Sequence, residues 1–373
     1  MKLKRQFCFL IIVTALFVNV YTPAIASANY VSITDIRTST PSLWCETYDT
    51  PWRQVTVDVS VEVPNVDVFP VLCVRMMPSI SKDALSGWQD ISMNKIGYLT
   101  ANLRKNNYLK TNERPASTQV FSSDQIVDVL PQNMVTSHTE AMALAIQLAQ
   151  DIFGLSEDSL MLQQTTVMDC VYTYTRKKNE ISLGKQVSET GCYRLSFTQL
   201  FAGIPMKDGK SCYADYGNSG ETILHTPTFS VVVDDTGCTK VRAALFSIED
   251  TVADDIPLVS FDAACYIFES EIIAGRLRSV DEVRLCYVPY LDKKDKDLIW
   301  LCPAWYLEGG YTRSAEDEFT PIINDETGEV MGDGMEHRAL IVDAQNGILL
   351  DYNATGKTRR VVLPLKTWDE VSR

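Results

Sequence analysis

The residues that could act as nucleophiles and bases are few in this sequence and lie far apart. Only three histidines, His138, His225 and His337, occur among its 373 residues. A serine in Gly217-Asn218-Ser219-Gly220 would need a histidine base and an acid to orient it, but Gly, Asn and Ser clusters typically form turns. Cys212 could use His225 as a base, although a structural cysteine is the commoner outcome. We therefore predict that the chain is not an enzyme and has no catalytic residue, with a secreted hydrolase as the least favoured alternative.

The cysteines and acids do not have the spacing of a metal site. None of the ten cysteines forms a Cys-x-x-Cys pair, and the three histidines are scattered, whereas zinc sites use closely spaced Cys and His. The segment from Asp292 to Asp297 lacks the glycine and the distal glutamate of an EF-hand loop. We expect neither a metal nor a cofactor.

Two cysteines lie where a disulfide could form. Strands expected at 285–290 and 298–307 flank a polar turn at 292–297, and pairing position 290 with 298 places Cys286 opposite Cys302. Cross-strand neighbours on one face are close enough to bridge. A disulfide and two apolar thiols in a sheet fit the pattern equally well.

Aromatic residues gather in the second of these strands. Trp300, Trp305 and Tyr306 are candidate binding residues, because aromatic rings on a strand face can stack on sugars or peptides. Trp300 and Trp305 are directed to opposite faces by strand alternation unless Pro303 introduces a bulge. Packing of these rings in the core is therefore the preferred interpretation.

The N-terminal residues 1–28 have the pattern of a secretory signal peptide. A basic segment at 1–6 precedes an apolar run at 7–21, and small residues then offer cleavage after Ala26 or Ala28. The apolar run is shorter than the roughly 20 residues of a spanning helix. We expect a secreted or extracytoplasmic bacterial protein with no membrane span after cleavage.

The composition is that of an acidic globular protein. Hydrophobic residues make up 46% and charged residues 22% of the chain, and 34 Lys and Arg face 48 Asp and Glu, for a net charge of −14. An acidic surface repels phosphate backbones, so we expect no nucleic-acid partner.

Alternation and capping signals predict the main elements. Residues 29–50 have the composition of an irregular lead-in, and valines alternate with polar residues over 55–63, which predicts a strand with one buried face. Ser137 and Glu140 form a capping box that opens a helix through Phe153. Ser260 caps a second helix, and antiparallel strands follow each helix.

This repeated order predicts an α+β fold. We expect a β-rich domain at 29–117 followed by two tandem helix-on-antiparallel-sheet modules at 118–250 and 251–373. One larger domain whose elements happen to alternate is the alternative. A long polar loop at 309–337 interrupts the second module.

Three segments resemble PepSY-type modules of exported Gram-positive proteins and of metallopeptidase propeptides. They are the helix 139–153, the strand YRLSFTQLFAGIPM at 193–206, and the segment from WLCPAWYLEG to ALIVDAQNGILLDY within 300–352. In such modules a helix packs on an antiparallel sheet, and a strand ends in an aromatic-x-Gly-Ile-Pro corner. The last segment is also similar to the C-terminal part of YycI-like regulatory proteins. Residues 120–355 resemble an exported family of unknown function from gut Gram-positive bacteria.

The resemblance implies a non-catalytic role, since such modules bind or restrain partners outside the cell. We expect a protein-interaction or regulatory protein of the bacterial envelope, with an unidentified envelope protein or peptide as partner. A module that binds wall glycan or peptide is the alternative. Gly203 and Pro205 in the corner have a structural interpretation, because glycine adopts backbone angles forbidden to other residues and proline ends a hydrogen-bond ladder.

Overall fold

The structure is a computed structural model whose described residues fall into two units. The described residues are 30–77, 89–93, 99–102, 108–178, 181–206, 212–215, 221–224, 227–292, 294–295, 297–311, 322–323, 330–332, 336–350, 361–362 and 365–366. Unit 1 contains Met1–Glu62, Pro257–Arg284 and Trp305–Asp351, and unit 2 contains Val63–Ile256, Leu285–Ala304 and Tyr352–Arg373. The expected signal peptide at 1–28 lies outside the described residues.

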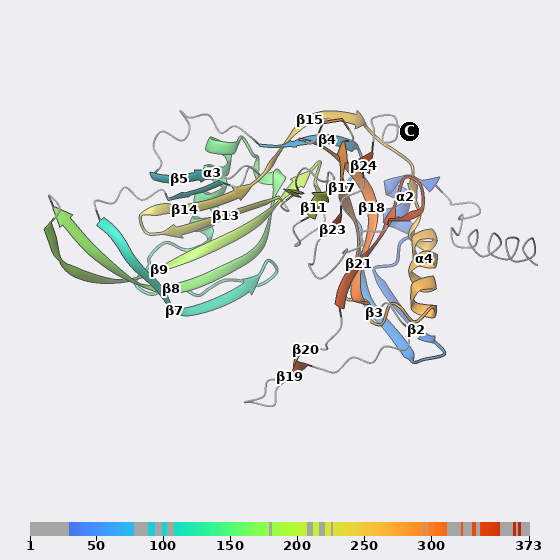
Figure 1. The fold of residues 1–373 in the computed structure, drawn as a ribbon, viewed down its shortest axis with the longest axis horizontal. Helices are drawn as coiled ribbons and strands as arrows, with labels where there is room; N and C mark the ends of the chain where they lie inside the picture. Colours follow the sequence, from blue (N-terminus) through green and yellow to red (C-terminus); the bar gives the residue numbers. More distant parts are fainter. Residues whose placement is uncertain are drawn as a thin grey trace, which may run out of the picture. The chain divides into compact units, whose positions relative to one another are not determined.

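Unit 1 combines two helices with short strands (Figure 1). Its elements are β1 (Tyr30–Val31), α2 (Ile33–Ser39), β2 (Leu43–Asp49), β3 (Gln54–Glu62), β16 (Leu258–Val259), α4 (Phe261–Ile273), β19 (Ile322–Ile323), β20 (Val330–Gly332), β21 (Glu336–Asp343) and β22 (Ile348–Leu350), together with the start of β17 (Glu282–Asp292) and the end of β18 (Leu298–Tyr311). β2 pairs antiparallel with β3, and β3 pairs in parallel with β17 at Val61 and Val283. The alternation of buried valines predicted for β3 is confirmed.

The core of unit 1 is aromatic where α4 meets the sheet. Ser260 caps α4 as predicted. Phe261 at the start of the helix lies 6.2 Å from the Trp44 ring and 5.2 Å from the Trp305 ring. The indole N–H of Trp305 donates to the Val259 carbonyl at 2.9 Å. Buried aromatic side chains contribute large apolar areas, so this cluster fixes α4 against β2.

Unit 2 contains the longest strands of the described chain. Its elements are β4 (Val71–Met76), β5 (Gln89–Met93), β6 (Leu99–Asn102), β7 (Tyr108–Ser122), α3 (His138–Phe153), the 3-10 helix η1 (Glu157–Ser159), β8 (Leu160–Lys178), β9 (Ile181–Phe201), β10 (Ile204–Pro205), β11 (Cys212–Asp215), β12 (Glu221–Leu224), β13 (Thr228–Asp234), β14 (Gly237–Ala244), β15 (Phe246–Ala253), β23 (Val361–Val362), β24 (Leu365–Lys366) and the remainder of β17 and β18. One sheet has the order β5-β6-β14-β13-β9-β8-β7, and β15, β4, β18 and β17 are consecutive neighbours in another.

Helix α3 packs on the first of these sheets through small residues. The predicted capping box of Ser137 and Glu140 and the helix end at Gly154 are confirmed. Ala141, Ala145 and Ala149 are fully buried, and their spacing of four places them on one stripe. Alanines allow a close approach of helix to sheet, so larger side chains such as Leu144, which is 40% exposed, are displaced from the contact.

The predicted corner after β9 is a tight turn. Ala202 has φ 50° and Gly203 has φ 77°, so two consecutive residues adopt left-handed conformations that suit a two-residue hairpin. β10 then pairs back on β9, with Ile204 opposite Phe201 and Pro205 opposite Leu200. The positive backbone angle inferred for Gly203 is thereby confirmed.

The expected fold class, α+β with tandem PepSY-like modules behind a small β-rich domain, is wrong. The described chain is mostly β, with three α-helices and large curled sheets. β8 and β9 join β7, β13, β14, β5 and β6 in one sheet, because their long antiparallel ladder, which has two register shifts, offers pairing surface well beyond one compact module. The boundaries expected at 117/118 and 250/251 fall inside β7 and β15.

The lead-in expected at 29–50 is also different in the structure. Residues 33–39 form α2, with Ser32 as its cap, and residues 43–49 form β2. Thr50 and Arg53 close the turn between β2 and β3, because the Thr50 N–H donates to the Arg53 carbonyl at 2.9 Å. The segment is therefore a helix followed by the first strand of a hairpin.

Candidate interaction site along edge strand β2

Strand β2 is hydrogen-bonded on one side only within the described residues. It ends the strand order of its sheet, next to β3. The Val61 N–H donates to the Ser42 carbonyl at 3.0 Å, and the Thr50 N–H donates to the Arg53 carbonyl at 2.9 Å. Both pairs follow the register of the β2–β3 ladder.

These two hydrogen bonds fix which backbone groups of β2 point outward. Hydrogen-bonded and non-hydrogen-bonded pairs alternate along an antiparallel ladder. Since positions 42 and 50 bond toward β3, the even-numbered residues of β2 also do so. The N–H and C=O groups that point away from β3 are those of Leu43, Cys45, Thr47 and Asp49.

β2 differs from the other three strands that end the two large sheet orders. Register shifts interrupt the pairing of β15 with β4, of β7 with β8 and of β5 with β6. The pairing of β2 with β3 continues without a shift from Leu43 to Asp49. Bulges at edge strands disrupt addition of a further strand, so β2 is the most regular of these four edges in the described chain.

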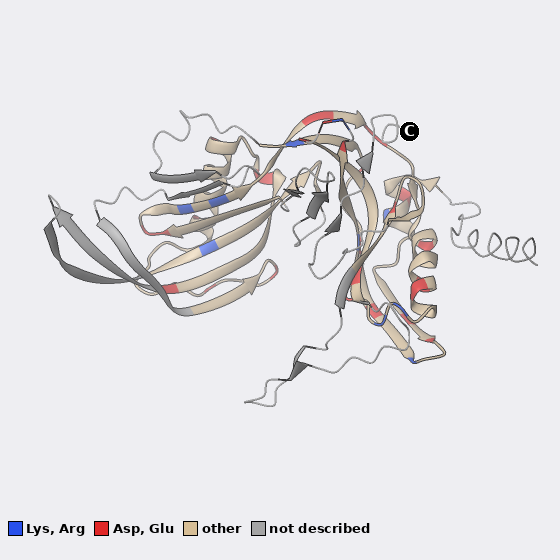
Figure 2. Cartoon of the chain, in the orientation of Figure 1, with Lys and Arg blue, Asp and Glu red and all other residues tan. Residues whose placement is uncertain are grey.

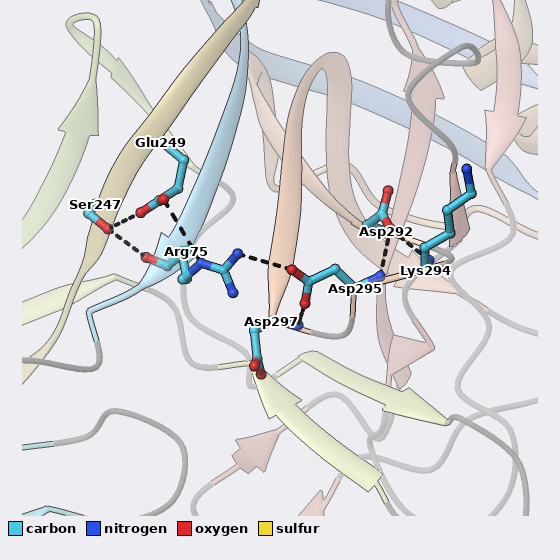
Figure 3. Close-up of polar contacts among 7 residues, drawn as sticks. All are labelled: Arg75, Ser247, Glu249, Asp292, Lys294, Asp295 and Asp297. Carbon is cyan, nitrogen blue, oxygen red and sulfur yellow. Dashed lines mark hydrogen bonds and ion pairs between the residues drawn. The ribbon is translucent and has the colours of Figure 1, made fainter.

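The β15 edge shows how such an edge is blocked (Figure 3). Ile248 pairs with Val74 and Asp250 with Cys73, so Glu249 is the extra residue of a bulge. The Arg75 guanidinium lies 4.0 Å from the Glu249 carboxylate and donates to Asp295 at 3.0 Å. The hydrogen bond to Asp295 raises the pKa of Arg75. Ser247 also donates to Glu249 at 3.0 Å, so this edge carries both a bulge and bound charges.

A polar cluster on the face of β2 that contacts α4 joins this strand to the helix. The Tyr48 hydroxyl lies 2.7 Å from Glu46 Oε2 and 2.9 Å from Glu269 Oε1. The Trp44 indole N–H donates to the same hydroxyl at 3.3 Å. Burial, followed by the hydrogen bonds with the two carboxylates, raises the pKa of Tyr48 above its ordinary value. The hydroxyl therefore keeps its proton, and it has only one to donate.

Cys265 lies next to this cluster. Its Sγ is 3.9 Å from Glu269 Oε1. Burial and then the neighbouring Glu269 charge raise the pKa of the thiol above its ordinary value. A thiol that stays protonated is a poor nucleophile, so Cys265 acts here as a small buried side chain.

The charged side chains of β2, β3 and α4 are all acidic, and Arg53 lies in the turn between β2 and β3. The elements β2, β3 and α4 contain no Lys, Arg or His, and Figure 2 shows acidic residues on α4. Two of their carboxylates face arginines, Glu62 near Arg284 at 3.8 Å and Glu271 with Arg276. For the others no ion pair is found among the described residues; they are Glu46, Asp49, Asp58, Asp262 and Glu269.

The structure places the predicted aromatic site residues in the interior. Trp300, Trp305 and Tyr306 are 2%, 0% and 1% exposed. A stacking platform requires exposed rings, so the burial supports the core-packing interpretation of this set. Ile322 and Ile323 of the long loop at 309–337 are described as β19, and most of that loop lies outside the described residues.

The predicted structural residues have different outcomes. Gly203 and Pro205 form the hairpin after β9. Cys286 and Cys302 lie on the neighbouring strands β17 and β18, and both are fully buried thiols in the structure. The disulfide between them stays a prediction. Ser219 and His225 lie outside the described residues, as does the side chain of Cys212.

The regular edge of β2 is the feature that the sequence interpretation missed. The segment 43–49 mixes polar with apolar residues, so the alternation of Trp44, Glu46 and Tyr48 on one face did not predict a strand. The signal that could have found it is the turn at Thr50–Arg53 directly before the alternating valines of β3, because such a turn predicts a hairpin partner upstream.

The fold and site together define a predominantly β protein in which β2 is the most regular of the four strands that end the two large sheets of the described chain. No protein-family model and no curated protein matches the sequence. Among solved structures, the chain is similar to an uncharacterized protein from Eubacterium rectale, with a TM-score of 0.45 and 12% identity, over 83% of this chain and 93% of that chain. A similarity of this size carries no argument about function. The PepSY and YycI resemblance stays a prediction. No helix in the described ranges is long and apolar enough to cross a membrane.

Proposed function

We propose that this protein is an exported, non-catalytic interaction protein of the bacterial envelope. It binds an extended segment of a partner protein, which adds as a further strand to β2. The observation that carries the proposal is the unbroken row of outward N–H and C=O groups at Leu43, Cys45, Thr47 and Asp49. In strand addition, main-chain hydrogen bonds supply the affinity.

The contrast between edges supports the choice of β2. A long regular edge can pair with strands of other chains and cause aggregation, and proteins usually protect such edges. The chain protects β15 with a bulge at Glu249 and the Arg75 contacts, whereas β2 has no shift in register. If the other edges are protected and β2 is not, a partner that occupies β2 explains the difference.

The test replaces one outward N–H without touching the β2–β3 ladder. Thr47→Pro removes a donor that points away from β3, and proline is tolerated at such positions of edge strands. Thr47→Val is the matched control, because both variants lose the 3.3 Å contact of the Thr47 and Thr56 hydroxyls. A photo-crosslinking amino acid at the exposed position 45 reports the partner in the native envelope.

We expect Thr47→Pro to reduce the crosslinked product about tenfold, since one or two lost hydrogen bonds are worth roughly 1–2 kcal/mol. Thr47→Val retains the product. The same crosslinker at Ile126, which is 89% exposed on unit 2, gives no such product. Equal yields from Thr47→Pro and Thr47→Val, with both variants melting like the parent protein, would refute strand addition at β2.

A further inference from the structure

We infer that the segment bound along β2 is basic, and that one of its Lys or Arg side chains contacts Glu46 and Glu269. The inference rests on the proposed strand addition and specifies the chemistry of the partner. It is carried by the hydrogen bonds at Tyr48 and by the charges of the surrounding elements.

The Tyr48 hydroxyl lies between two carboxylates and has one proton to donate. Two carboxylate oxygens lie 2.7 Å and 2.9 Å from one hydroxyl. The hydroxyl proton can satisfy one carboxylate, while the Trp44 N–H fills a lone pair of the hydroxyl oxygen. The other carboxylate then faces an oxygen lone pair of the hydroxyl at hydrogen-bond distance, and the Cys265 thiol, 3.9 Å from Glu269, is only a weak donor. A cation placed between Glu46 and Glu269 removes this repulsion, and hydrogen bonds between charged groups are the stronger kind.

The geometry of strand addition brings a partner side chain to this place. An added strand lies about 4.8 Å from β2, and its alternate side chains project on the same face as Glu46 and Tyr48. Glu46 is exposed and Glu269 is half-buried, so both remain accessible from that side. Cross-strand neighbours of opposite charge stabilise pairing.

The neighbouring charges favour the same partner. Asp49 on β2 and Asp262 on α4 are exposed, and no Lys, Arg or His of β2, β3 or α4 offsets them. Asp49 accepts a hydrogen bond from the Gln54 amide at 2.9 Å. The chain as a whole carries a net charge of −14. Complementary charge raises association rates and excludes acidic partners.

The test uses three synthetic ten-residue peptides and the full chain. In each peptide Thr alternates with one other residue, which is Lys, Gln or Glu. Binding is measured by fluorescence anisotropy at low and at physiological salt. The variants are Glu46→Gln and Glu269→Gln, which keep hydrogen-bonding groups near Tyr48. Glu157→Gln on η1 is the matched control for loss of one exposed acid.

We expect the Lys peptide to bind about tenfold more tightly than the Gln peptide, and the Glu peptide not to bind. The preference shrinks at physiological salt. Glu269→Gln and Glu46→Gln each reduce affinity for the Lys peptide by roughly three- to tenfold and leave the Gln peptide unaffected. Glu157→Gln changes neither affinity.

Failure of the two proposals gives different results. If Lys and Gln peptides bind equally and Thr47→Pro weakens both, strand addition stands and the basic partner is overturned. If the Lys peptide binds and Thr47→Pro has no effect, the peptide attaches elsewhere and both proposals fail. Absence of binding by all three peptides also overturns the inference.

Discussion

A single carboxylate, that of Asp235, binds the two residues that precede the cap of helix α3. Its Oδ1 accepts the Thr136 N–H at 2.9 Å, the Thr136 hydroxyl at 2.8 Å and the Val135 N–H at 3.0 Å. The Thr136 N–H is the largest cause that lowers the pKa of Asp235. The carboxylate thus joins the β13–β14 turn to the residues that precede the Ser137 cap.

We predict that Asp235→Asn lowers the free energy of unfolding by about 1 kcal/mol at pH 7, the usual size of a capping interaction. Because the pKa of Asp235 is lowered in the folded state, its contribution is present above the ordinary pKa of aspartate and is lost as pH falls through the lowered value. Urea titrations from pH 7 to pH 3 measure this dependence, which is weaker in the variant. An equal slope in both proteins would contradict the assignment, and Asp158→Asn is the control.

At the element scale, the chain segment with Pro131 and Gln132 lies directly against β9 at Gly191. The Gly191 N–H donates to the Gln132 carbonyl at 2.7 Å, and the Gln132 N–H donates to Asp169 at 2.6 Å. A Cβ on Gly191 would lie 2.2 Å from Pro131 Cβ and 2.6 Å from the Gln132 nitrogen. These atoms include backbone, so a side chain here displaces the whole segment.

We predict that Gly191→Ala destabilises the protein by about 2 kcal/mol or more, within the range of overpacking. Thermal melts followed by circular dichroism measure the loss. Ser196→Ala, also on β9, adds no atoms and shifts the melting temperature far less. A melting temperature for Gly191→Ala equal to that of the parent would exclude the close contact.

The individual elements were more predictable than their partners. Ser137 with Glu140, Ser260, and the alternating valines of β3 are local signals, and the structure confirms each. The pairing of β3 with β17, far away in sequence, leaves no local signal. The candidate site could not be predicted for the same reason, because whether β2 lies at an edge depends on which other strands pair with it.

At the scale of the whole molecule, edge protection governs self-association. Deleting Glu249 removes the extra residue of one of the two register shifts in β15 and one carboxylate near Arg75, while the shift between Thr251 and Ala253 remains. We predict that the deletion increases self-association, because a longer part of the β15 edge becomes regular and can pair with other chains. Sedimentation velocity over a concentration series measures it. Glu249→Ala, which keeps the bulge, stays closer to the parent protein, and an unchanged profile for the deletion would contradict this role.

The acidic composition was readable from the sequence, but its distribution was not. The net charge of −14 does not say where the acids lie, while the fold brings Glu46 and Glu269 from distant segments of the chain to the same hydroxyl of Tyr48. The same distance explains the wrong prediction of tandem modules. Repeated local order does not specify which strands share a sheet.

The hydrogen bond between Tyr48 and Glu269 joins residues 221 positions apart. For a chain exported N-terminus first, as proposed, β2 and β3 emerge from the translocation channel long before α4 does. Trp44 is then exposed to water until the C-terminal half has crossed. Folding dominated by such distant contacts is slow, so a chain exported in this way would depend on chaperones or rapid translocation to escape proteolysis.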